Sequence, residues 1–456
     1  MGSDAGLRIY RNALAPWITL VIFSCLITLY QIRKARIVTL LPWLILLGIA
    51  LAFMVNLRED GIWIYPAIGI ALFVLFLSRI RMPLPQKTHR NWWKRALQAA
   101  LLPLIPIAIS CLSMIGVAAI NYHHYGIFLA NDRTQGSFAD MIEEISLIED
   151  GQKDPRTQWV TKEMLLQALD ASPTLDSIED QILESYDFWT IRFGDGTVQG
   201  DYLQWVMRTA MDNAGLYQTS EAAQAFSNAV AIELNEAFSN GSLRADSLMH
   251  PSSQGPGLSI SDCISFLPDF ADNAVQVIGF DTLKERFPVY TELGEAELAP
   301  FQQATGLSFS KEMQDAGCTT AKIESAITAI YQHIGIALFV LAIILFLTSL
   351  TTSIRTKSLK RYAPFAINGC LVLISALLCV YIVTIFIEFL GGTWPLQFYA
   401  TPAYTLILVF DVVAILGFAD TMTAIRSMPH KFHPTASNSP GLEEHRKEQR
   451  SAKDRR

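Results

Sequence analysis

The stretch IVTLLPWLILLGIALAFMVNL, residues 37–57, contains no charged side chain. A helix rises 1.5 Å per residue, so about 20 apolar residues cross the ~30 Å hydrocarbon layer of a bilayer. Six other stretches have a similar composition, over approximately residues 13–30, 62–77, 96–120, 334–353, 364–390 and 403–423. They are continuously apolar and do not alternate as barrel strands do. The sequence therefore predicts an α-helical polytopic membrane protein with seven transmembrane helices.

A polar insert, residues 121–332, separates the first four stretches from the last three. It contains 32 of the 42 acidic residues but only 11 of the 35 basic ones, a formal charge of −21, and the remainder of the chain carries +14. Lys and Arg gather after the first, third, fifth and seventh stretches. Because such residues are retained on the cytoplasmic side, we predict a membrane protein with a cytoplasmic C-terminus. The N-terminus and the insert are expected outside.

Four regions follow from this pattern. Residues 1–120 should form four transmembrane helices, and residues 121–332 an acidic, mainly α-helical extracytoplasmic domain. Residues 333–426 should form three transmembrane helices. The tail, residues 427–456, is polar and charged and is expected to be disordered in the cytoplasm.

Local signals predict helices within the insert. Ser172-Pro173 fits an N-cap followed by proline at the first helical position. A second helix is expected over about 202–214, with Gly215 as its stop. A third should start after Thr219 or Ser220 and end near Asn240-Gly241. Residues 242–261 are rich in Ser, Gly and Pro and predict a loop or a hinge, followed by a shorter helical part.

Two cysteines, Cys263 and Cys318, lie in the insert, and the other four lie in apolar stretches. An even pair in an oxidising compartment predicts a disulfide, which would constrain a loop of about 55 residues. The alternative is a pair of free, buried thiols.

The tripeptide Arg58-Glu59-Asp60 lies at the outer end of the second stretch. Two adjacent carboxylates beside an arginine could hold a divalent metal or act as a base on a lipid-linked phosphate substrate. We therefore take Glu59 and Asp60 as candidate catalytic residues. The alternative is that a tight turn between two helices simply needs polar side chains.

Asn131-Asp132-Arg133 follows the fourth stretch and is expected to line the same outer site. Arg58 and Arg133 would then hold phosphate, and Asp132 would support them. His123 and His124 precede this segment, but adjacent helical side chains diverge by about 100° and do not readily share one metal.

Asp411 lies inside the seventh stretch, and Glu388 lies near the outer end of the sixth. An ionisable group at membrane depth usually faces a cavity or a partner, which leaves a secondary transporter as a further alternative. The sequence contains no Walker A, dinucleotide-binding, HExxH, CxxC or GxSxG motif. The negative insert argues against a nucleic-acid partner.

Three segments are distinctive as a set: LREDGIW at 57–63, NYHHYGIF at 121–128 with GSF at 136–138, and GDYLQWVMR at 200–208 with ELNEA at 233–237. Together they resemble a group of bacterial polytopic membrane proteins, some of which are similar to membrane glycosyltransferases of the GT-C type. The resemblance implies a location in the bacterial inner membrane and a lipid-linked sugar as partner. In that architecture the catalytic carboxylate lies on the first outer loop, after the first membrane helix. Here that loop is expected to be cytoplasmic and has no Asp or Glu.

The leading expectation is therefore a protein that handles a lipid-linked glycan or a related envelope precursor. It would be either glycosyltransferase-like, with Glu59 and Asp60 as base or metal ligands, or a degenerate relative. The alternative is a non-catalytic scaffold whose outer domain docks a protein partner and whose helices contact lipid.

Overall fold

The seven predicted membrane helices are confirmed in a computed structural model of the chain. It describes residues 14–58, 61–81, 92–151, 158–193, 198–247, 259–281, 299, 303, 311–389 and 396–426. Over these residues the chain is mainly helical, and its extended pairing includes an isolated bridge between Ile148 and Ala245. The helices long and apolar enough to cross a membrane are Ala15–Ile32, Ile37–Leu57, Gly61–Ile80, Ala96–Tyr125, Ser325–Arg355, Leu359–Glu388 and Thr401–Arg426.

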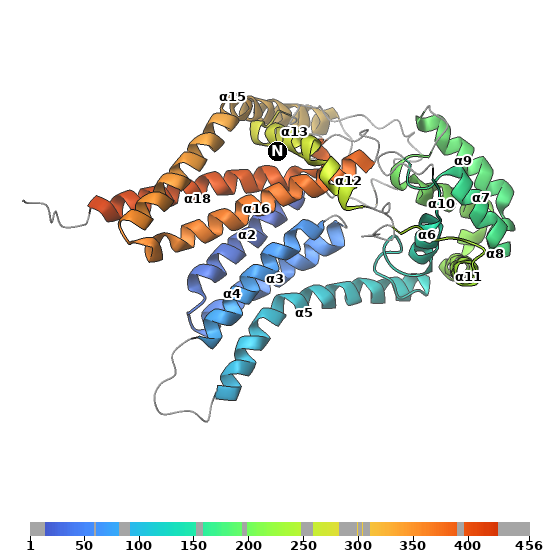
Figure 1. Cartoon of the computed structure of the whole chain (residues 1–456), viewed down its shortest axis with the longest axis horizontal. Helices are drawn as coiled ribbons and strands as arrows, with labels where there is room; N and C mark the ends of the chain where they lie inside the picture. The colour runs from blue at the N-terminus through green and yellow to red at the C-terminus, as the bar shows by residue number, and fades with distance from the viewer. Residues whose placement is uncertain are drawn as a thin grey trace, which may run out of the picture.

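These spans pack into one bundle around a shared apolar core (Figure 1). Its elements are α2 (Ala15–Ile32), α3 (Ile37–Leu57), η2 (Gly61–Ile64), α4 (Tyr65–Ile80), α5 (Trp92–Tyr125), α15 (Lys311–Arg355), α16 (Leu359–Phe389), α17 (Leu396–Tyr399) and α18 (Thr401–Arg426). The α18 helix is the most enclosed span, with more than half of its apolar window buried. The α5 helix is the least enclosed and has most of its apolar surface exposed.

Glycines bring the membrane helices into close contact. A Cβ added to Gly48 of α3 would lie 2.8 Å from Ile109 Cδ1 and 3.0 Å from Pro106 Cα, both on α5. A Cβ at Gly369 of α16 would lie 2.6 Å from the Phe346 ring of α15. Small residues are typical of membrane interfaces, where close packing replaces the hydrophobic effect as the force between helices.

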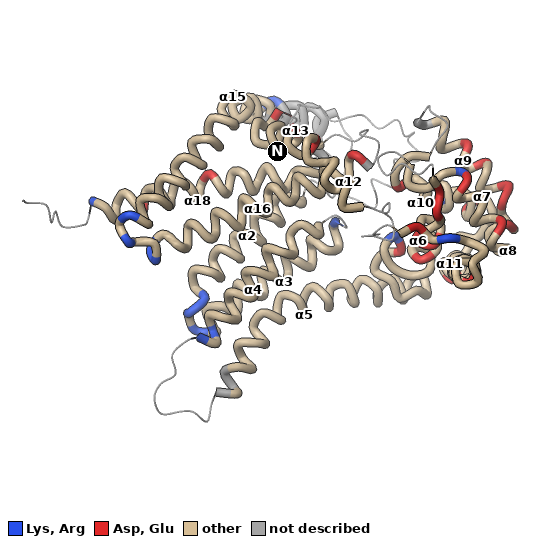
Figure 2. The backbone as a smooth tube through the Cα atoms, viewed as in Figure 1, with Lys and Arg blue, Asp and Glu red and all other residues tan. Residues whose placement is uncertain are grey.

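Basic residues mark one end of this bundle, and the insert lies at the other (Figure 2). The described basic residues are Arg33, Lys34 and Arg36 between α2 and α3, Arg79 in the last turn of α4, and Arg355, Lys357, Lys360 and Arg361 around the α15–α16 connection, among others. Arg361 forms a two-armed ion pair with Asp420, at 2.7 and 2.9 Å, which joins α16 to α18 there. The charge asymmetry of the sequence is therefore an asymmetry of the folded molecule.

Most of the described insert forms a separate helical unit with its own core. Its elements are α6 (Ser137–Leu147), α7 (Lys162–Ala171), α8 (Pro173–Asp176), α9 (Glu179–Phe193), η4 (Gly200–Tyr202), α10 (Leu203–Asn213), η5 (Leu216–Gln218) and α11 (Ser220–Asn240). The core includes Met141, Leu165, Val206, Val230 and Leu234, each fully buried.

The predicted helix boundaries in the insert are confirmed. Ser172 accepts a hydrogen bond from the Leu175 amide at the start of α8, and Thr219 accepts one from the Ala222 amide at the start of α11. Gly215 and Gly241 adopt positive φ angles of 73° and 81° directly after α10 and α11. Local capping chemistry sets these ends, which is why they could be predicted without knowledge of the tertiary fold.

The last described helices of the insert belong to the bundle instead. Helix α13 (Leu267–Gly279) packs against α15 and α16, and Ala274, Val277 and Phe280 join the bundle core. Helix α12 (Ile260–Ser265) precedes it and is joined to α16 by a hydrogen bond from the Tyr381 hydroxyl to the Cys263 carbonyl. Trp159, from the segment before α7, is buried with Phe266 and contacts this region. The range 121–332 thus contains two parts with different surroundings.

Two predictions reach residues that the structure does not fully describe. Cys263 is half-buried in α12, whereas the side chain of Cys318 lies outside the described residues. The disulfide between them stays a prediction. The tail from residue 427 onward also lies outside the described residues, and its disorder likewise stays a prediction.

Candidate functional site

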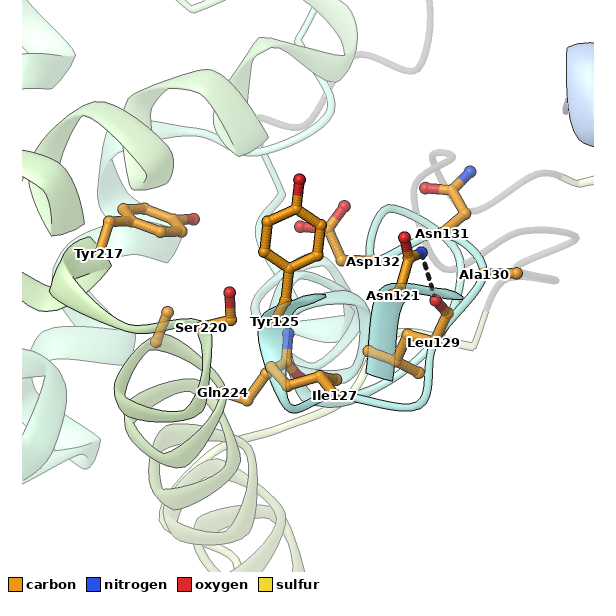
Figure 3. A pocket seen from close by; sticks show the side chains of 11 residues that line it. Asn121, Tyr125, Ile127, Leu129, Ala130, Asn131, Asp132, Tyr217, Ser220 and Gln224 are labelled. Atoms are coloured by element: carbon orange, nitrogen blue, oxygen red, sulfur yellow. Dashed lines mark hydrogen bonds between the residues drawn. The ribbon is translucent and has the colours of Figure 1, made fainter. Parts of the chain in front are cut away.

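A pocket of about 360 Å³ lies where α5 leaves the bundle and meets the first turns of α11. Its lining comes from the end of α5, the following loop, η5 and α11: Asn121, Tyr125, Ile127, Leu129, Ala130, Asn131, Asp132, Tyr217, Ser220, Ala223 and Gln224. Figure 3 shows the Tyr125 ring standing in the middle of this group, with the Tyr217 hydroxyl directed toward it. The volume is within the range of small-molecule sites, ~300–1,000 Å³.

Two glycines shape the loop that closes the pocket. Gly126 ends α5 with φ +75°, and its amide donates to the Tyr122 carbonyl at 3.0 Å. A Cβ there would lie 2.4 Å from a carboxylate oxygen of Glu221 on α11. Gly136, with φ +78°, precedes α6, and a Cβ there would lie 2.7 Å from Leu129. Only glycine tolerates both the positive φ and the close approach, so these positions set the shape of the loop.

An ion pair borders the pocket. Asp132, in the loop, lies 2.9 Å from Arg208 of α10, and the Tyr217 hydroxyl also interacts with Arg208. Burial acts to lower the pKa of Arg208, but the hydrogen bond and charge of Asp132 outweigh it and raise that pKa above its usual value. Burial raises the pKa of Tyr217, against the opposing effect of the Arg208 charge. Asp132 and Arg208 therefore neutralise each other, with Tyr217 as a neutral phenol at neutral pH.

A second ion pair follows in the next residue. Arg133 pairs with Asp201 of η4, and Gln204 donates to the same carboxylate at 3.0 Å. The Arg208 guanidinium also lies over the Phe138 ring, 4.3 Å from its centroid. These contacts join the loop residues 132–133 and Phe138 to the segment 200–208.

The amide and hydroxyl groups that line the pocket suit hydrogen bonding to a neutral polar ligand. Asn121 donates to the Leu129 carbonyl at 2.7 Å, and Gln224 accepts from the Ser137 amide at 3.0 Å. Both side chains are thus held in place by the backbone. Each amide retains further donors or acceptors, and the phenols add flat apolar faces. Among the described residues, no group of three His, Cys, Asp or Glu side chains is arranged to hold a metal.

Arg58 lies elsewhere. It follows the last residue of α3, is 4% exposed, and donates to the Tyr399 carbonyl of α17 at 3.1 Å. That carbonyl ends a short helix and needs a donor, so Arg58 joins α3 to α17. Arg58 is not among the residues lining the pocket. Glu59 and Asp60 lie outside the described residues, so their predicted role as base or metal ligands remains a prediction.

The two carboxylates within the apolar spans differ. Asp411 of α18 is 4% exposed, and its Oδ1 has no hydrogen-bond partner among the described residues. Glu388 lies near the end of α16, is half-buried, and interacts with neighbouring groups. Neither lines the pocket at the end of α5.

Sequence reasoning identified Asp132 and Arg133 but missed Tyr217, Ser220 and Gln224. These three residues have no motif of their own, and the fold brings them to Asp132 from about 90 positions away in the chain. The chain matches no family model, no curated protein and no solved structure. The resemblance to GT-C-type proteins therefore remains a prediction.

Proposed function

We propose that this chain is an inner-membrane protein that binds the sugar portion of a lipid-linked glycan in the pocket between α5 and α11. The observation that carries the proposal is the lining, in which fixed amides and two tyrosine rings surround a cavity at the end of a membrane helix. Sugars present hydroxyl groups and flat C–H faces, and these match amides and aromatic rings respectively.

The position of the pocket suits a ligand that is anchored in lipid. The apolar part of α5, Ala96–Tyr125, has 30 residues, more than the ~20 needed to cross the hydrocarbon. Its last turn therefore extends into the headgroup region, and it carries the exposed Tyr122 and Tyr125. Tyrosines are enriched at this boundary because their rings are apolar and their hydroxyls polar.

The ion pairs beside the pocket favour sugar binding over sugar transfer at this site. Asp132 and Arg208 are committed to each other, as are Arg133 and Asp201. A general base needs a carboxylate free to take a proton from the substrate. We therefore propose that the pocket recognises the sugar and does not itself supply the base; the predicted base residues Glu59 and Asp60 lie outside the described residues. The basic end of the bundle would face the cytoplasm, and the insert and pocket the outside.

The proposal is tested by binding to the full chain in phospholipid nanodiscs. The probe is a polyprenyl diphosphate that carries one N-acetylhexosamine, and the reference is the same lipid without sugar. Tyr125→Ala should weaken sugar-lipid binding up to about tenfold, because an aromatic contact contributes ~0.5–1.5 kcal/mol.

Tyr122→Ala is the matched control. It lies one turn earlier on α5, is similarly exposed at 60% against 63%, and does not line the pocket. The affinity of the Tyr122→Ala variant for the sugar-bearing lipid should stay close to that of the unmodified chain. Equal effects of the two substitutions, or equal binding of the lipid with and without sugar, would contradict the proposal.

A further inference from the structure

Helices α12 and α13 have an apolar stripe that nothing in the described chain covers. The stripe consists of residues at helical spacing along both helices: Ile260, Ile264, Leu267, Ala271 and Val275. Four of these side chains are strongly exposed, at 71% for Ile260, 60% for Ile264, 49% for Leu267 and 55% for Val275. Exposed leucine or isoleucine is common singly, but a continuous stripe indicates a contact surface.

The adjacent face of the same helices is fixed to the membrane bundle. Asn273 donates to the Thr384 hydroxyl of α16 at 3.0 Å, and the Tyr381 hydroxyl donates to the Cys263 carbonyl at 2.8 Å. The rings of Phe270 and Tyr381 meet edge to face, with centroids 5.6 Å apart. The stripe is therefore held in a defined position beside α16.

That position is at the boundary of the hydrocarbon layer. The hydrocarbon is about 20 helical residues thick. Counted from the basic end of the bundle, Tyr381 follows Arg361 by 20 residues, and Gly335 precedes Arg355 by 20. Both residues contact this segment, since a Cβ at Gly335 would lie 2.8 Å from the Ile278 carbonyl oxygen. Helices α15 and α16 thus both place α13 about 20 helical residues from the basic end of the bundle.

A third span agrees with the first two. The Phe280 ring, directly after α13, lies 5.4 Å from the Tyr404 ring of α18, centroid to centroid. Tyr404 precedes Arg426 by 22 residues. The α12–α13 segment is therefore level with the far boundary of the hydrocarbon on α15, α16 and α18.

We propose that α12 and α13 form an interfacial membrane anchor whose apolar stripe inserts into the lipid leaflet on the insert side. Lipid is the occupant that fits, because the contacts with α15, α16 and α18 place the exposed stripe at the boundary of the hydrocarbon. Helices that lie in the interface bury an apolar face among the acyl chains and keep their polar face in water. Here the described acidic residues Asp262, Asp269 and Asp272 lie off the stripe.

The anchor has a consequence for the insert. Trp159, which precedes α7, packs against Phe266 at the junction of α12 and α13. A helix pair seated in the leaflet would therefore fix one contact point of the α6–α11 unit relative to the membrane surface. The inference is independent of whether the pocket binds sugar.

The test is photocrosslinking of the full chain in vesicles of phosphatidylethanolamine and phosphatidylglycerol. A benzophenone amino acid replaces Ile264 or Val275, and intact mass spectrometry follows irradiation. We expect a mass increase of one phospholipid at both positions. Leu112, exposed on α5, is the positive control for lipid contact, and Ile191, 81% exposed on α9, is the apolar control on the insert.

Lipid adducts at positions 264 and 275 at a yield similar to that at 112, with none at 191, support the anchor. A yield no higher than at 191 would overturn it, because the stripe would then face water. A crosslink to protein in place of lipid at both positions would also overturn it, because the stripe would then be a protein contact.

Discussion

The membrane bundle and the α6–α11 unit are both helical, yet they are held together by different interactions. In the bundle, glycines such as Gly48 and Gly369 bring helix surfaces into direct contact, and large apolar side chains point outward. In the α6–α11 unit, apolar side chains are enclosed in a core of their own, and Arg133 of the preceding loop pairs with Asp201 of η4. In water, burial of apolar surface drives packing, whereas in lipid close contact must replace it.

This difference locates the site. The pocket lies where the two regions meet, at the end of α5, which begins in the bundle and ends beside α11. There the chain changes from apolar to hydrogen-bonding side chains within one helix. The comparison can be tested with substitutions that should destabilise either the bundle or the α6–α11 unit and leave the other region unchanged.

The largest effect is expected from Leu234→Ala in the core of the α6–α11 unit. Leu234 is fully buried, and truncation of a buried leucine costs about 2–5 kcal/mol. Hydrogen exchange of the core amides of α10 and α11 should accelerate strongly, while α16 and α18 stay protected. Ile232→Ala, at a 51% exposed position on the same helix, is the control and should change little. Loss of protection in both regions would show that they unfold as one unit.

A smaller effect is expected from Gly48→Ala in the bundle. The added methyl would lie 2.8 Å from Ile109 and separate α3 from α5, a form of overpacking that costs about 1–3 kcal/mol. Thermal unfolding in detergent should occur at a lower temperature. Gly69→Ala on α4 is the matched control, since no atom lies within 4 Å of its added Cβ. An unchanged or raised unfolding temperature for Gly48→Ala would refute the close-contact account.

The smallest effect concerns Glu233, which accepts hydrogen bonds from Thr174 and Ser172 at the start of α8. Burial acts to raise the pKa of Glu233, but these hydrogen bonds lower it below the usual 4.5. A lowered pKa means that the stabilisation is present above about pH 4.5 and is lost as the pH falls through the folded-state value. Glu233→Gln should therefore destabilise the α6–α11 unit by about 1 kcal/mol at neutral pH.

The difference in the free energy of unfolding between the Glu233→Gln variant and the unmodified chain should shrink on acidification. Chemical denaturation at several pH values would measure it. Glu236→Gln, at an exposed position on the same helix, serves as the control. If this difference in the free energy of unfolding stays constant down to acid pH, the charge of Glu233 does not contribute to stability.

Much of the fold could be predicted because its signals are local. Apolar length identified the spans, and single capping residues such as Ser172, Thr219 and Gly241 identified helix ends in the insert. The placement of α12 and α13 was missed, because helical spacing alone does not tell whether an apolar face meets protein or lipid.

The site was only partly predictable, for a related reason. Asp132 and Arg133 border the pocket as part of the predicted outer site, but their partners Arg208 and Asp201 are distant in the chain. Arg58 was expected beside them because all three follow the ends of apolar stretches. Its partner, the Tyr399 carbonyl, is 341 residues away, and no local pattern could identify it.

Hydrogen exchange of the full chain in nanodiscs, with and without the N-acetylhexosamine-bearing polyprenyl diphosphate, tests the central claim most directly. The account predicts slower exchange in residues 121–132 and 216–224, and little change within α15, α16 and α18. No change around the pocket, with protection confined to those bundle helices near Asp411, would contradict it and favour a transport pathway through the membrane.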